Sequence, residues 1–128
     1  MSLKNTLLLA ILLTVSVLQA CGTEKKPKEV SFQQDVMPIL KANCLDCHTI
    51  GGEGYKKAGL SMDSYENLLK GTKYGKIIVP GNSLDSVFIQ VVEGRVDKSI
   101  TMPHGGKSLV KTEIETLKTW VDQGAKNN

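Results

Sequence analysis

The stretch that decides the fold is Cys44-Leu45-Asp46-Cys47-His48, a C-x-x-C-H run. Cysteines three residues apart lie on one side of a helical turn, so each thiol can bond to one of the two vinyl groups of a single porphyrin. The adjoining histidine then lies over the ring centre, where a neutral imidazole nitrogen binds iron. The run therefore predicts covalent attachment of one haem through Cys44 and Cys47, with His48 as its proximal ligand.

Three other interpretations of these residues stay open. A redox-active C-x-x-C is expected beside a strand-helix-strand pattern, which the sequence around the run does not supply. A structural zinc site needs four ligands, and beyond the run the chain offers only His104 and Cys21. A disulfide between the two cysteines of the run would leave His48 without a role. Haem attachment uses all three side chains, so we favour it.

The N-terminus predicts export. Lys4 supplies a positive charge before residues 7–18, a twelve-residue stretch interrupted only by Thr14 and Ser16, which is typical of the hydrophobic region of a signal peptide. A membrane-spanning helix needs about 20 apolar residues, and this stretch is shorter. We expect residues 1–20 to be a lipoprotein signal peptide, with retention as an uncleaved anchor as the alternative.

The sequence that follows predicts a lipid anchor. Leu18-Gln19-Ala20-Cys21 resembles a bacterial lipobox, in which the cysteine is lipidated and becomes the first residue of the mature chain. More than one acyl chain holds a protein on a bilayer where a single chain is marginal. We therefore expect an exported protein, lipid-anchored to a bacterial membrane through Cys21 and facing the periplasm or the cell exterior.

The rest of the chain divides into a tether and one domain. Residues 22–29 are polar, contain Pro27 and lack apolar periodicity, so we expect residues 21–30 to be the lipidated cysteine and a flexible tether. Residues 31–126 suit a single small domain. The chain has a formal net charge of +3 and no basic stripe, so nucleic acid is not an expected partner.

Apolar residues recur at helical spacing in four segments of this domain. Ser31 is expected to cap the first helix, with Gln34 bonding back to it, and Pro38 to distort it. The glycine-rich residues 49–59 indicate a loop. The other expected helices span residues 60–69, capped near Ser61 or Asp63; residues 83–93, with Leu84, Val87, Phe88 and Val91 facing inward; and residues 111–123, with Ile114, Leu117, Trp120 and Val121 on one face.

Four side chains are candidates for the sixth ligand of the iron. Met37 precedes the attachment run by seven residues on the same helical segment, so it would lie on the proximal side. Met62 occupies a plausible core position, where a thioether most often fills a gap. Met102 lies in an irregular loop long enough to reach the opposite haem face, and we select it as the distal ligand. His104 or an open position are the alternatives.

The order of motifs resembles the planctomycete-type cytochrome c domain, within the broader c-type cytochrome fold. The resemblance covers nearly all of residues 31–125 and implies an all-α fold of about four short helices wrapped around one covalently attached haem c, with His48 and Met102 axial. His104 stands where a second proline is common in the family. The matching positions are Phe32, Asp35-Val36, Pro38-Ile39-Leu40, Cys44, Cys47, His48, Gly59-Leu60, Val79-Pro80-Gly81, Ser86, Met102-Pro103, Gly105-Gly106, Glu113-Ile114, Trp120-Val121 and Gly124-Ala125.

Supporting residues can be assigned on the same grounds. The His48 nitrogen that does not bind iron is expected to donate to a carbonyl, which fixes the ring and raises its basicity. The resemblance makes the segment around Val79 and Pro80 a candidate for that carbonyl. The cations available to pair with the haem propionates are Arg95, Lys98 and Lys107.

The function expected from this site is outer-sphere transfer of single electrons. Its partners would be redox proteins that dock transiently. No small-molecule substrate is expected, and the protein would not be an enzyme. The alternative is a haem-based gas sensor or a peroxidase-like enzyme with a labile or open distal site, for which only His104 and Arg95 are available as a distal acid-base pair.

Overall fold

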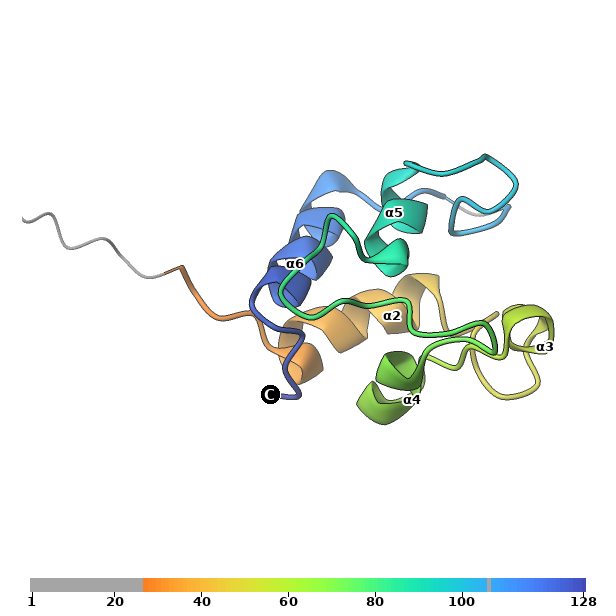
Figure 1. Ribbon diagram of the computed structural model, residues 1–128, viewed down its shortest axis with the longest axis horizontal. Coiled ribbons are helices and arrows are strands. Elements are labelled where there is room, and N and C mark those ends of the chain that lie inside the picture. The colour runs from red at the N-terminus through yellow and green to blue at the C-terminus, as the bar shows by residue number, and fades with distance from the viewer. Residues whose placement is uncertain (1–26, 106) are drawn as a thin grey trace, which may run out of the picture.

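Over residues 27–105 and 107–128, which the computed structural model describes, the chain forms short helices and no strand (Figure 1). The all-α prediction is therefore confirmed. The predicted signal peptide and Cys21 lie outside the described residues. The elements are η1 (Phe32–Val36), α2 (Met37–Asn43), α3 (Glu53–Ala58), α4 (Tyr65–Lys70), α5 (Val87–Glu93) and α6 (Lys111–Asp122).

The first helix begins at the predicted cap and changes its winding at Pro38. The Ser31 hydroxyl accepts from the backbone N–H of Gln34 at 3.2 Å, but the Ser31 N–H donates to the Asp35 carboxylate at 2.8 Å, not to Gln34. η1 is a single wide π-helical turn, and α2 follows with Pro38 in its first turn. A proline is tolerated there because an N–H in the first turn has no partner within the helix.

The core lies where α6 crosses η1. Trp120 and Phe32 are buried with ring centroids 5.4 Å apart, and Tyr65 meets Phe32 edge-on at 5.2 Å. The Trp120 indole donates to the Lys126 carbonyl at 2.9 Å, and the Tyr65 hydroxyl to the Ala125 carbonyl at 2.8 Å. The predicted apolar face of α6 is confirmed, since Leu117, Trp120 and Val121 are buried and Ile114 packs against them.

Two of the middle segments differ from the expectation. Residues 49–59 were expected to form a loop, but α3 occupies their second half and ends at Gly59, whose φ of 71° suits glycine. The helix expected over residues 60–69 begins later, because the hydroxyl that caps it belongs to Ser64 and accepts from the Asn67 N–H at 3.2 Å. Residues 60–63 are therefore not helical and connect α3 to α4.

The predicted inward face of α5 is confirmed for Phe88 and wrong for Leu84 and Val87. The helix begins at Val87, not at residue 83, because the Ser86 hydroxyl accepts from the Val79 N–H at 2.9 Å and donates to the Asn82 carbonyl at 2.8 Å, so the preceding residues form a turn. The later start turns Phe88, Ile89 and Val92 inward. Leu84 and Val87 are 67% and 45% exposed, and Val91 is only partly buried against the core.

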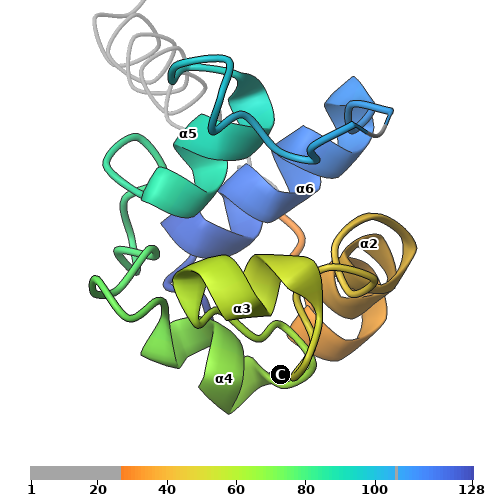
Figure 2. The ribbon, with the colours of Figure 1, turned by 90° about the vertical axis from the view of Figure 1, so that its right-hand side faces the viewer.

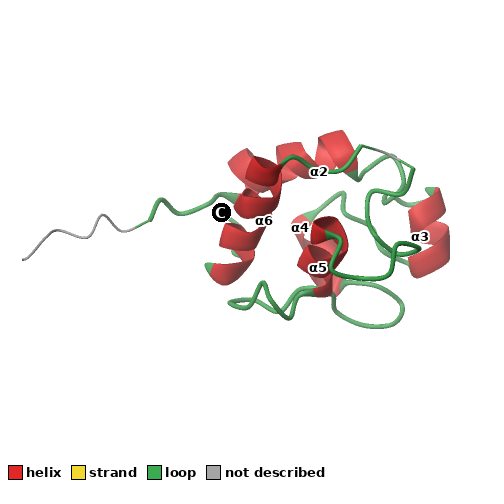
Figure 3. Cartoon of the chain, turned by 90° about the horizontal axis from the view of Figure 1, so that it is seen from above, coloured by secondary structure: helices red, strands yellow, loops and turns green. Residues whose placement is uncertain are grey.

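The segment that enters the domain is hydrogen-bonded to its C-terminal end. The Val30 N–H donates to the Gln123 side chain at 2.7 Å, and the same side chain donates to the Lys28 carbonyl at 3.1 Å. Lys126 pairs with Glu29 at 2.5 Å. Figures 1 and 3 both place α6 toward the end where the chain enters and α3 at the opposite end. None of the helices in the described part of the chain has the length and apolar character needed to cross a bilayer.

Candidate functional site

The C-x-x-C-H run continues the backbone of α2. The Cys44 N–H donates to the Leu40 carbonyl at 2.8 Å, and the His48 N–H donates to the Cys44 carbonyl at 2.9 Å. These turns place both cysteines just after the last residue of α2. Both thiols are free, with Cys44 half-buried and Cys47 exposed, so the disulfide alternative is not formed in this structure.

The imidazole of His48 is buried, and one of its nitrogens is held. Nδ1 lies 3.3 Å from the Leu60 carbonyl oxygen, and because a carbonyl only accepts, Nδ1 carries the proton and Nε2 keeps its lone pair. A second bond from the Met62 N–H to the His48 carbonyl, at 2.7 Å, fixes the same segment. The expected carbonyl was near Val79 and Pro80, and the structure corrects it to Leu60.

Burial sets the protonation of both groups at this site. Burial raises the pKa of the Cys44 thiol to about 11, and the negative charges of Glu113 and Cys47 add to the effect. Burial also lowers the pKa of His48, against an opposing contribution from the Leu60 hydrogen bond; the positive charge of His104 lowers it further. His48 is therefore neutral near pH 7, which is the form that binds a metal.

The loop that carries Met102 lies at the same end of the domain as the run. His104 of this loop lies close enough to His48 to lower its pKa electrostatically. Figure 2 views that end, with the loop between α5 and α6 above α3 and the end of α2. The Met102 N–H donates to the Val91 carbonyl at 3.0 Å, and its side chain is partly buried against the core.

The other candidate ligands have different surroundings. Met37 and Met62 are buried in the hydrophobic core, 8% and 5% exposed, as the gap-filling role of a thioether predicts for Met62. His104 is exposed. Within the described residues, no three His, Cys, Asp or Glu side chains gather closely enough to hold a metal ion by themselves.

The three cations expected to pair with the haem propionates differ in their surroundings. Arg95 forms an ion pair with Glu93, which also accepts from Lys118 at 2.8 Å. The hydrogen bond from Lys118, followed by that from Arg95, lowers the pKa of Glu93, so this group ties α5 to α6. Lys98 and Lys107 are exposed.

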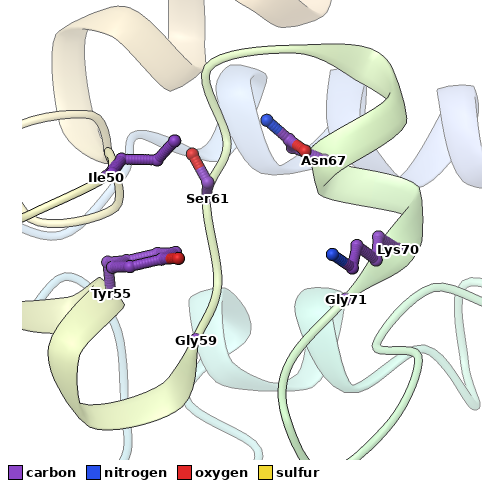
Figure 4. A pocket seen from close by; sticks show the side chains of 7 residues that line it. All are labelled: Ile50, Tyr55, Gly59, Ser61, Asn67, Lys70 and Gly71. Atoms are coloured by element: carbon purple, nitrogen blue, oxygen red, sulfur yellow. The ribbon is translucent and has the colours of Figure 1, made fainter.

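A cavity of about 140 Å³ between α3 and α4 is not the haem site. Figure 4 shows side chains of Tyr55, Ser61 and Lys70 around it, and His48 does not line it. Cofactor pockets are usually about 300–1,000 Å³, which is larger than this cavity. Ser61 faces it, while Leu60 and Met62 on either side belong to the core.

The donor set fits a covalently attached haem. Two free thiols flank one turn at the end of α2, and the adjoining imidazole is neutral, with Nδ1 bonded to a backbone carbonyl and Nε2 left to bind iron. A small all-α domain with this arrangement defines the class of c-type cytochromes.

The comparison with protein families confirms this class. Residues 44–105 match the family model described as Planctomycete cytochrome C, which is the family that the sequence resembles. This segment of the chain is similar to that family, and the function of such a domain is haem-based electron transfer. Searches of curated proteins and of solved structures found no match.

Sequence reasoning missed two groups that touch His48. The Leu60 carbonyl is a backbone atom twelve residues away in the chain, and no residue type marks such an acceptor. Gly54 lies against the imidazole ring, and its only signal was the density of glycines after the run.

Proposed function

We propose that the protein is a membrane-anchored c-type cytochrome with one covalent haem that carries single electrons between exported or membrane redox partners. The observation that supports it best is the buried His48 at the end of α2, with Nδ1 bonded to the Leu60 carbonyl, inside the segment that matches the family. A bound haem c supplies a one-electron couple between Fe(II) and Fe(III).

The residues of the chain attach, orient and shield this group. Cys44 and Cys47 would form the thioethers, and His48 would bind iron through Nε2 in the orientation that the Leu60 carbonyl fixes. Met102 would supply a thioether as the second ligand to the iron. Two protein ligands limit rearrangement between the oxidation states and leave no position for a substrate, so the protein is a carrier and not an enzyme.

The proposed anchor sets where partners can approach. From Cys21 to Lys28 the chain spans at most about 25 Å, at about 3.6 Å for each residue. Lys28, Glu29 and Val30 are bound to the C-terminal end of the domain. The C-x-x-C-H run lies at the other end (Figure 1), which supports docking of exported redox proteins from the aqueous side.

A redox titration of the chain and of its Cys21→Ser variant tests this proposal. Both proteins are made in a host that exports them and attaches haem. We expect both to give one reversible one-electron transition in the visible spectrum, the unchanged chain in the membrane fraction and the variant in the soluble fraction. The electron-transfer proposal is contradicted if the spectrum does not change reversibly, and the anchoring proposal is contradicted if both proteins fractionate alike.

A further inference from the structure

Gly54 lies directly against the ring of His48. A Cβ built on Gly54 would stand 2.7 Å from Cε1 and 2.9 Å from both Nδ1 and Nε2 of the imidazole. These three ring atoms are nearly equidistant from that point, so the backbone of α3 covers the face of the ring and not its edge. Real Cβ atoms essentially never approach other atoms this closely, and a side chain at this position would displace the ring.

Backbone hydrogen bonds hold α3 in this position. The Tyr55 N–H donates to the Cys47 carbonyl at 3.0 Å, and the Gly52 N–H donates to the Thr49 carbonyl at 2.9 Å. The first turn of α3 is thereby bonded to the same run that carries His48. A Cβ on Gly52 would itself lie 2.5 Å from the Cys47 carbonyl oxygen, so the approach is close along the whole turn.

The conformation of Gly54 does not explain why it is glycine. It lies inside α3 and is absent from the glycines with positive φ, so its backbone suits any residue. Glycine is also a poorer helix former than alanine. The close approach to the imidazole is therefore the reason that accounts for glycine at this position.

We propose that Gly54 is a positioning residue for the proximal ligand. Its backbone fixes the plane of the His48 ring, while the Leu60 carbonyl fixes the ring edge. Together they keep Nδ1 bonded to the carbonyl, which keeps Nε2 basic and favours Fe(III). This inference rests on the proposed function, because it requires His48 to bind the iron.

The Gly54→Ala variant tests the inference. Ordinary contact requires about 3.4 Å or more, so the ring must move by more than half an ångström and the 3.3 Å bond to Leu60 must lengthen or break. We expect the one-electron equilibrium to shift toward Fe(II) about tenfold, which raises the reduction potential by about 59 mV. The low-spin ferric EPR signal should shift as well, since it reports the ligand plane.

Lys57→Ala is the matched control, because Lys57 is an exposed residue of the same helix. Its potential and EPR signal should equal those of the unchanged protein. If Gly54→Ala behaves like Lys57→Ala in both measurements, the inference is overturned, although the redox titration of the unchanged protein still supports the proposed function.

A second measurement does not depend on the variant folding. NMR of the unchanged ferrous holoprotein should show nuclear Overhauser contacts between the α-protons of Gly54 and the ring protons of His48. Their absence would overturn the inference. A chain that matures without haem would instead contradict the proposed function itself.

Discussion

The Met102→Ala variant is expected to bind carbon monoxide rapidly and in full when reduced, whereas the unchanged protein does not. Removal of the thioether opens the distal coordination position, and an exogenous ligand can then reach Fe(II). The weak long-wavelength band that ferric iron shows with methionine sulfur should vanish at the same time. Visible spectroscopy of the oxidised, reduced and carbon monoxide-treated proteins checks both effects.

Met62→Leu is the control for this experiment. Met62 is 5% exposed in the core, and a leucine of similar volume should leave both the band and the resistance to carbon monoxide intact. If the unchanged protein binds carbon monoxide at once, the distal site is open and the sensor or peroxidase alternative is correct. If the band survives in Met102→Ala, another methionine supplies the distal thioether. If the unchanged protein lacks the band and binds carbon monoxide only after His104→Ala, the distal ligand is His104.

The Trp120→Ala variant is expected to lose about 3–5 kcal/mol of unfolding free energy. Trp120 is 1% exposed, packs on Phe32 and donates to the Lys126 carbonyl, so truncation leaves both a cavity and an unpaired acceptor. Small domains are stable by only about 5–15 kcal/mol, so the loss removes much of the margin. Denaturant unfolding of the holoprotein, followed by circular dichroism, measures it.

Tyr74→Ala provides the matched control for the loss of an aromatic side chain. Tyr74 is 82% exposed and contacts Lys73 at the surface, so its removal should change the unfolding free energy by less than about 0.5 kcal/mol. Equal midpoints for Trp120→Ala and Tyr74→Ala would show that the contact between η1 and α6 does not carry the stability assigned to it.

The sequence predicted a helix correctly where its ends depend only on residues nearby in the chain. α6 follows from apolar residues at helical spacing before Gly124, and the structure gives Lys111–Asp122 against the expected residues 111–123. α5 was misplaced because its start depends on the Ser86 hydroxyl, which bonds to Val79 seven residues earlier. A hydroxyl engaged by a distant backbone group looks the same in sequence as one inside a helix.

The side chains that would bind haem could be predicted from the sequence, but the backbone groups that orient His48 could not. Cys44, Cys47 and His48 stand together in the chain, so the run alone indicates attachment and ligation. The groups that orient His48 are the Leu60 carbonyl and the Gly54 backbone, and neither has a side chain whose type indicates this role. They become visible only when the chain folds back over the imidazole.

The central claim is that Cys44 and Cys47 bond one haem covalently. The direct test is the mass of the denatured chain after export in a host competent for haem attachment. We predict a gain of one haem that survives denaturation and is lost when both cysteines are replaced by alanine. A colourless chain, or one whose mass shows no added haem, would contradict the account.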